Sequence, residues 1–242
     1  MPCASGQKKG NMSVRTNNYI FYHIPCTGGS WVKRAIRHAM KGNRNFFWKR
    51  PDVEDGEVDE ATYWERLASD MLSMKKGHLT PSQITKADKD GLFSFAFVRE
   101  PISWYKSYWA NRGRVRELNG KSWHTFIFDW AWDENFETFC GNMLRMFPEG
   151  ALTTLYKCFL GEDGTSLDFV GKQESLKEDL IKVLDGLGEK YNLTKIEELE
   201  KENTTSEEIK KLCVLSTPTK KKLMSHEQWI YLNFYPEYLK HG

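Results

Sequence analysis

The segment YIFYHIPCTGGSWVKRAIRHAM, residues 19–40, decides the predicted fold of this chain. Residues 19–24 are largely apolar, residues 25–30 read PCTGGS, and residues 31–40 place apolar side chains on one helical face and charged ones on the other. The pattern predicts a buried strand that turns through two glycines into an amphipathic helix. The first N–H groups of such a helix and its dipole favour an anion, so we expect a loop that binds phosphate or sulfate.

The turn matches neither of two common phosphate-binding patterns. No lysine follows Gly29, as it would in the GxxxxGK[ST] loop of nucleoside triphosphatases, and Gly28 and Gly29 are adjacent rather than spaced as in GxGxxG. Taken alone, the segment also fits a tight turn that needs only the backbone freedom of glycine. A second site is needed to choose between these two interpretations.

The second site follows the apolar run GLFSFAFVR, residues 91–99, which is typical of a central strand in a parallel sheet. Pro101 then opens a helix that we expect to run to about Arg116 and to carry Ser103 and Ser107 one turn apart. Arg99 therefore lies at the carboxyl end of a core strand, where open α/β sheets bind ligands. Its guanidinium suits a bidentate bond to an oxyanion, with Ser107 as a further donor, although pairing with a nearby acid is the alternative.

Three segments resemble motifs of the 3′-phosphoadenosine 5′-phosphosulfate (PAPS) dependent sulfotransferases, in particular their carbohydrate and Golgi-type branch. Residues 23–30, HIPCTGGS, are similar to the family's phosphosulfate loop HIPKTGGT[ST], and residues 95–107 are similar to its 3′-phosphate motif FxFVRxPxxxxxS. Residues 168–176, DFVGKQESL, resemble the family's DFVGRFExL more weakly. The three matches come in the family's order and span residues 19–187.

The resemblance implies one α/β domain with a central, mostly parallel sheet flanked by helices and a P-loop-like phosphosulfate-binding loop. It implies a sulfotransferase that moves the sulfonate of PAPS to a hydroxyl of a carbohydrate or small-molecule acceptor, without a metal. The loop would hold the 5′-phosphosulfate, Arg99 and Ser107 the 3′-phosphate, and a basic loop at residues 217–222 would close over the nucleotide, unless that segment is an exposed helix start. The residues implied to bind PAPS are Cys26, Thr27, Gly28, Gly29, Ser30, Trp31, Arg99, Ser107, Lys172, Lys220 and Lys221.

Cys26 departs from the family pattern because it occupies the position of the motif lysine. In comparable oxyanion sites, the loss of a donor directed at the developing charge raises the activation barrier by an amount on the order of 3 kcal/mol. Three interpretations remain open: another cation such as Arg112, Arg114 or Lys172 substitutes, the protein binds the nucleotide with weak or no turnover, or residue 26 is a variant position.

His78 is the candidate general base, since histidine titrates near neutral pH and the family often places a catalytic histidine or glutamate between the two anion motifs. An ordinary loop histidine is the alternative, and the runners-up in the acidic segment 52–60 are Glu54, Glu57 and Glu60. No CxxC or HExxH spacing indicates a metal site. A P-loop-type phosphotransferase is the rival enzyme class, and the missing GK[ST] argues against it.

Composition limits the remaining possibilities. The 242 residues suit one domain, for which we expect a flexible tail at 1–17 and the α/β domain at 18–242. A formal charge of +2 predicts no strong attraction to nucleic acid or membrane, and the sequence does not define an oligomeric state. Five cysteines without a framework pattern, and no apolar run long enough for a signal or a span, favour a cytoplasmic protein over a trimmed lumenal domain.

Overall fold

The computed structural model describes residues 13–40, 46–47, 78–119, 131–200 and 205–241, and its centre is a five-stranded sheet in the order β3-β1-β2-β4-β5. The three longer strands run parallel, whereas the two-residue strands β1 and β3 add to the edge in antiparallel pairs. The strands are β1 Val14–Arg15, β2 Tyr19–Tyr22, β3 Phe46–Phe47, β4 Phe93–Val98 and β5 Phe169–Lys172.

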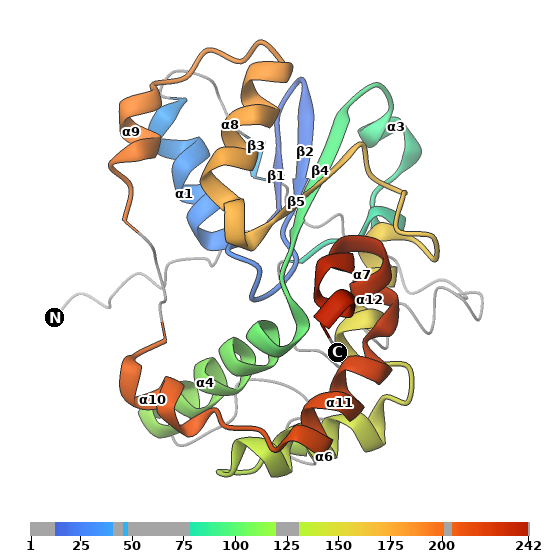
Figure 1. Cartoon of the computed structure of the whole chain (residues 1–242). Coiled ribbons are helices and arrows are strands. Elements are labelled where there is room, and N and C mark those ends of the chain that lie inside the picture. Colours follow the sequence, from blue (N-terminus) through green and yellow to red (C-terminus); the bar gives the residue numbers. More distant parts are fainter. Residues whose placement is uncertain (1–12, 41–45, 48–77, 120–130, 201–204, 242) are drawn as a thin grey trace, which may run out of the picture.

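One face of the sheet is covered by α1 Gly29–Ala39 and α8 Leu176–Gly186, and α9 Leu193–Glu197 packs against these two helices (Figure 1). Alternate residues of the strands point to this side, so Phe21 and Phe95 pack there against the apolar face of α1. The apolar face that the sequence pattern predicts for α1 is thus buried against the sheet.

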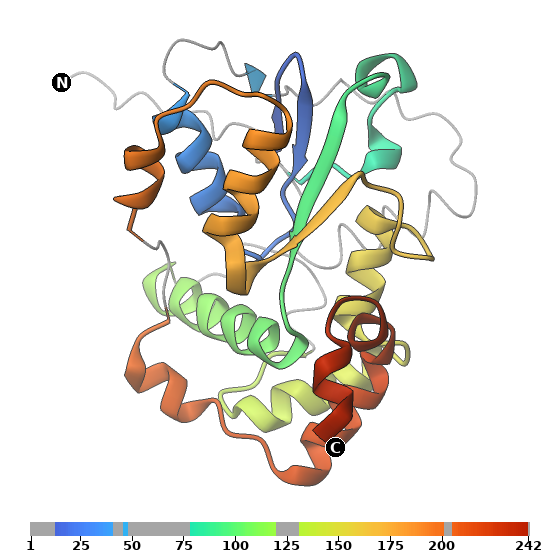
Figure 2. The same cartoon turned by 45° about the horizontal axis from the view of Figure 1, so that its top comes forward.

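The opposite face and the carboxyl ends of the parallel strands are covered by a larger helical layer (Figure 2). The remaining alternate residues, among them Tyr22 and Val98, join the aromatic side chains of this layer in a second core. The main helices of this layer are α4 Pro101–Asn119, α6 Phe136–Met146, α7 Ala151–Leu160, α11 Thr217–His226 and α12 Gln228–Phe234. The shorter elements are η1 Pro81–Gln83, α3 Lys86–Lys89, η2 Gln173–Ser175, α10 Glu207–Leu212 and η3 Pro236–His241.

The predicted α/β class with a mostly parallel sheet is confirmed, and two boundaries need correction. The expected tail at 1–17 extends too far, because Val14 is buried and pairs with Phe21 in the sheet. A two-residue strand is too short to produce an alternation that the sequence would reveal. The sequence pattern also predicts a final helix around residues 219–233, and the structure divides it at Glu227 into α11 and α12. A helix expected near residues 61–76 lies outside the described residues.

The topology brings the ends of β2, β4 and β5 to one edge of the sheet, where each strand passes into a helix. In both cartoons α4 crosses below this edge (Figures 1 and 2). Open parallel sheets bind ligands at this edge, which makes it the place to examine for a functional site. Among the helices that the structure describes, none has the length and apolar composition that a membrane crossing requires.

Candidate functional site at the carboxyl ends of β2 and β4

The loop that joins β2 to α1 is held through its carbonyl groups. Each of the four consecutive carbonyl oxygens of residues 23–26 accepts a hydrogen bond from a side chain. In chain order the donors are His78 Nδ1 at 2.7 Å, Thr27 Oγ1 at 2.7 Å, Trp104 Nε1 at 2.9 Å and Arg99 Nη1 at 3.1 Å. Three of these donors lie outside the loop, so the rest of the fold fixes its path.

The start of α1 keeps unused donors. Gly28 has φ 89°, a left-handed conformation that favours glycine, and its carbonyl accepts the N–H groups of Trp31 and Val32. The N–H groups of Gly29 and Ser30 have no acceptor within the residues that the structure describes, and no side chain there caps this helix. Two free N–H groups at the positive end of a helix dipole suit an anion.

The space behind these N–H groups is filled by His23. A Cβ atom on Gly29 would lie 2.0 Å from His23 Cδ2, so only glycine fits at this position. The His23 ring is 4% exposed, and its Nδ1 has no hydrogen-bond partner in the described structure. Burial lowers the pKa of His23 well below its ordinary value, and the nearby His78 and Lys33 lower it further. The ring is therefore neutral and adds no positive charge behind the loop.

Arg99 connects the two strand ends. Besides the bond from Nη1 to the Cys26 carbonyl, its Nε donates to Ser103 Oγ at 2.9 Å. A guanidinium has five N–H donors, so three have no partner among the described residues once these two are used. The predicted neighbourhood of Arg99 and the β2–α1 loop is confirmed by the 3.1 Å contact. Pairing of Arg99 with an acid is not observed among the described residues.

Ser103, rather than Ser107, is the hydroxyl that contacts Arg99. Ser103 follows Arg99 by four residues and Ser107 follows by eight, so the three residues are on successive turns at helical spacing. Ser107 is half-buried and makes no hydrogen bond within the described residues. The i, i+4 spacing from Arg99 to Ser103 was a signal in the sequence that could have identified this pair.

Two predicted ligand donors in the loop are already used by the fold. The Thr27 hydroxyl is buried and donates to the Ile24 carbonyl, while Trp31 donates through its N–H to Gly28 and through its indole to the Leu199 carbonyl at 3.2 Å. Ser30 is half-buried and keeps both its hydroxyl and its N–H without a partner in the described part of the chain. Ser30 and the Gly29 amide are therefore the donors that the loop itself offers.

The predicted lysines do not converge on this loop. Lys172 ends β5 beside Val98, but its Nζ lies 3.1 Å from Glu237 and 4.7 Å from the centre of the Tyr235 ring. The basic loop expected at 217–222 is instead the first part of α11, with Lys220 and Lys221 exposed. Ser216 caps this helix and Pro218 lies in its first turn, a combination that favours a helix start. The side chains of Arg112 and Arg114 lie outside what the structure describes.

His78 lies next to the loop, edge-to-face with the His23 ring at 4.6 Å between centroids. Its Nδ1 is 2.7 Å from the His23 carbonyl oxygen, which can only accept. Nδ1 therefore carries the proton of the neutral ring, and Nε2 holds the basic lone pair. The runner-up bases Glu54, Glu57 and Glu60 lie outside the described residues.

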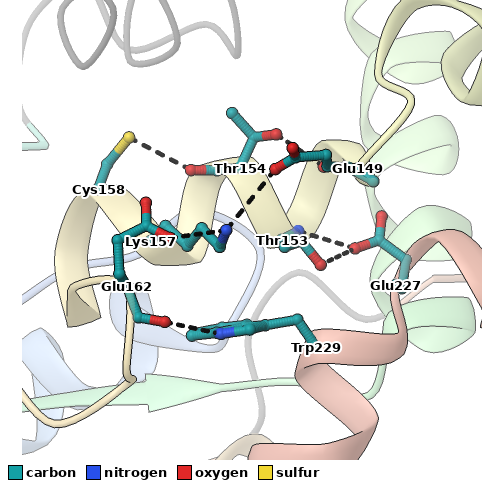
Figure 3. Close-up of polar contacts among 9 residues, drawn as sticks. Glu149, Thr153, Thr154, Lys157, Cys158, Glu162, Glu227 and Trp229 are labelled. Carbon is teal, nitrogen blue, oxygen red and sulfur yellow. Dashed lines mark hydrogen bonds and ion pairs between the residues drawn. The ribbon is translucent and has the colours of Figure 1, made fainter. Parts of the chain in front are cut away.

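A second helix start, that of α7, carries an anion supplied by the chain itself. Figure 3 shows Glu227 reaching Thr153, whose N–H and hydroxyl each donate to Oε2 at 2.7 Å. The N–H of Leu152 and the hydroxyl of Tyr105 donate to Oε1 at 3.0 and 2.7 Å. Burial raises the pKa of Glu227 above its ordinary value, and these four hydrogen bonds offset only part of that rise. Every oxygen of this carboxylate is used inside the protein, so the site is structural.

No group of three or more metal-ligating side chains is present among the described residues. Comparisons of the chain with protein-family models, with curated proteins and with solved structures each returned no match.

Proposed function

We propose that this chain binds PAPS at the edge formed by β2 and β4 and is a sulfotransferase acting on a hydroxyl of a carbohydrate or small molecule. The observation that carries the proposal is the bond from Arg99 to the Cys26 carbonyl, because it joins a guanidinium with three unused donors to a helix start with two unused N–H groups. Two anion-binding positions side by side suit a nucleotide with phosphate groups at both its 3′ and 5′ positions.

In this proposal each element of the site has a separate role. The P-loop-like turn, through the Gly29 and Ser30 amides and the Ser30 hydroxyl, binds the 5′-phosphosulfate, and Arg99 binds the 3′-phosphate. PAPS supplies the sulfonate. His78 Nε2 accepts the proton of the acceptor hydroxyl as that oxygen bonds to sulfur and the sulfur–oxygen bond to the phosphate breaks. The tautomer that makes Nε2 basic is favoured by the bond between Nδ1 and the His23 carbonyl.

Cys26 supports a second candidate function, a nucleotide-binding protein with weak or no turnover. Lys172 is engaged by Glu237 and Tyr235, and Lys220 and Lys221 are exposed on α11, so these three lysines do not replace the missing motif lysine in this conformation. A thiol is a weak donor and offers little to the developing negative charge. The proposed catalytic step would then be slow, while nucleotide binding would be retained.

Ligand-dependent stability tests the binding part of the proposal. Adenosine 3′,5′-bisphosphate at about 100 times its Kd should raise the free energy of unfolding by about 2.7 kcal/mol. Adenosine 5′-monophosphate at the same concentration should stabilise the protein less, because it lacks the group assigned to Arg99. Stabilisation by ATP with magnesium and not by the bisphosphate would favour the phosphotransferase class and overturn the proposal.

Turnover of labelled PAPS with a panel of hydroxyl acceptors separates the two candidate functions. If wild type is inactive and Cys26→Lys transfers sulfonate, the native chain is the nucleotide-binding form. If wild type is active, His78→Ala should lower kcat about 100-fold or more with an unchanged Kd for adenosine 3′,5′-bisphosphate, as expected on loss of a general base. An unchanged kcat in that variant would remove His78 from the catalytic role.

A further inference from the structure

The carboxyl end of β4 is clamped by a buried tyrosine from α7. The Tyr156 hydroxyl accepts the N–H of Arg99 at 2.7 Å and donates to the carbonyl oxygen of the same residue at 3.2 Å. Tyr156 itself is fully buried. One side chain thus satisfies both backbone groups of the residue that carries the proposed 3′-phosphate ligand.

Two more tyrosines hold the residues around this clamp. Tyr231 donates to Glu100 Oε1 at 2.6 Å, and Tyr235 donates to Glu174 Oε2 at 2.9 Å. The other oxygen of Glu174 accepts the N–H of Glu100 at 3.2 Å. These bonds tie α12 to the ends of β4 and β5, but neither of these tyrosines contacts Arg99 through a hydrogen bond.

Hydrogen bonds therefore hold both the main chain and the guanidinium of Arg99. Tyr156 holds its backbone, and Ser103 together with the Cys26 carbonyl holds its guanidinium. The backbone end matters because β4 stops at Val98, so the neighbouring strands no longer hold the main chain at residue 99. A small displacement there would carry the whole guanidinium away from a planar, bidentate geometry.

We propose that Tyr156 is a positioning residue for Arg99, and that it determines the preference of the site for an adenine nucleotide that carries a 3′-phosphate over one that lacks it. This inference rests on the proposed function and deepens it. Tyr156 does not touch the ligand in this account. It acts by holding the Arg99 main chain so that the three unused guanidinium donors face one phosphate.

The test measures this preference by calorimetry in the full chain. For wild type, Tyr156→Phe and the control Tyr105→Phe, the Kd values for adenosine 5′-monophosphate and adenosine 3′,5′-bisphosphate are determined and their ratio is taken. Tyr156→Phe should lower the ratio about tenfold, roughly the contribution of one hydrogen bond, through weaker binding of the bisphosphate alone. Tyr105→Phe also removes a buried hydroxyl, the one bound to Glu227, and should leave the ratio at the wild-type value.

A double-mutant cycle with Arg99→Ala distinguishes positioning from general loosening of the fold. Arg99→Ala should reduce the ratio on its own, and adding Tyr156→Phe should then change it no further. Tyr156→Met, which also lacks the hydroxyl, serves if the phenylalanine variant does not fold, and it should give the same lowered ratio.

The outcomes separate this inference from the function on which it rests. If wild type prefers the bisphosphate and the Tyr156 variants keep that preference, or lose affinity for both nucleotides equally, the positioning role is overturned and the proposed function stands. If wild type binds neither nucleotide, or shows no preference, both proposals fail.

Discussion

The starts of α1 and α7 differ in whether a side chain of the protein accepts the first N–H groups of the helix. At α7, the Glu227 carboxylate accepts the N–H groups of Leu152 and Thr153, so this helix start is closed without a ligand. Figure 3 shows the contact with Thr153. At α1, Gly29 and Ser30 keep their N–H groups without an acceptor in the described structure, and the Arg99 guanidinium binds the Cys26 carbonyl of the same loop.

This difference distinguishes a helix start that is closed within the fold from one whose first N–H groups are open to a ligand. The start of α4 is also closed, because the Glu100 carboxylate accepts the N–H groups of Ile102 and Ser103 at 3.1 and 2.7 Å. At the α1 start, by contrast, the carbonyls of residues 23–26 accept side-chain donors, while the N–H groups of Gly29 and Ser30 have no acceptor among the described residues. An open donor pair beside a cation suits a bound anion, whereas a buried carboxylate on amides suits helix capping.

The largest expected effect comes from removing the internal anion. Glu227→Ala leaves the Tyr105 hydroxyl, the Leu152 N–H and both donors of Thr153 buried without an acceptor. We expect a loss of about 4 kcal/mol or more in the free energy of unfolding, since each of the four unsatisfied buried donors costs about 1–3 kcal/mol. Urea denaturation measures this loss. A loss below about 1 kcal/mol would contradict the structural assignment of this helix start.

The second effect concerns affinity rather than stability. Arg99→Ala should weaken binding of adenosine 3′,5′-bisphosphate about 100-fold, because charged hydrogen bonds to a phosphate are removed. Calorimetry measures the change. The matched control is Lys157→Ala on α7, whose ammonium already lies 2.7 Å from Glu162 and 3.6 Å from Glu149 (Figure 3). An equal loss of affinity in both variants would show that the α1 start is not the distinctive site.

The third effect tests how tightly the His23 ring packs behind the first amides of α1. Gly29→Ala places a methyl group 2.0 Å from the buried His23 ring, and we expect overpacking of this kind to cost about 1–3 kcal/mol. Gly141→Ala in α6 is the control, because a Cβ there meets nothing within 4 Å, and it should stabilise the helix by about 0.5–1 kcal/mol. Thermal unfolding compares the Tm of the two variants. Equal shifts in Tm would mean that the His23 ring moves aside at little cost.

The smallest effect is the pH dependence that His23 contributes. Because its folded pKa is lowered, the unfolded chain takes up this proton first, and stability falls as pH drops below the ordinary histidine value. The fall is at most about 1.4 kcal/mol per pH unit for one group. Between pH 7 and 5 the free energy of unfolding should fall more steeply with decreasing pH for wild type than for His23→Gln. His38→Gln, on the exposed face of α1, should match wild type, and three parallel curves would refute the account.

Local patterns in the sequence were sufficient for the framework of this fold. The apolar runs that became β2 and β4, and the helical spacing in α1, depend on neighbours within a few residues, so they could be predicted. The contact between Arg99 and the loop also followed, because parallel strands end at the same edge. The strand Val14–Arg15 was missed because two residues carry no periodicity.

The contacts that the sequence did not reveal join residues far apart in the chain. Tyr156 reaches Arg99 across 57 positions, and Lys172 reaches Glu237 across 65. No local pattern marks a tyrosine for a strand end or removes a lysine from a binding loop. Ser103 is the exception, because its spacing from Arg99 was visible in the sequence although Ser107 was chosen as the donor.

The position of Glu227 also has a kinetic consequence. Its hydrogen bonds link residues that are 74, 75 and 122 positions apart, so long stretches of chain must be closed before any of them forms. We therefore expect this carboxylate to be enclosed after the main folding barrier. Stabilising contacts that form late slow unfolding and leave the folding rate almost unchanged, so Glu227 makes the native state long-lived rather than quick to reach.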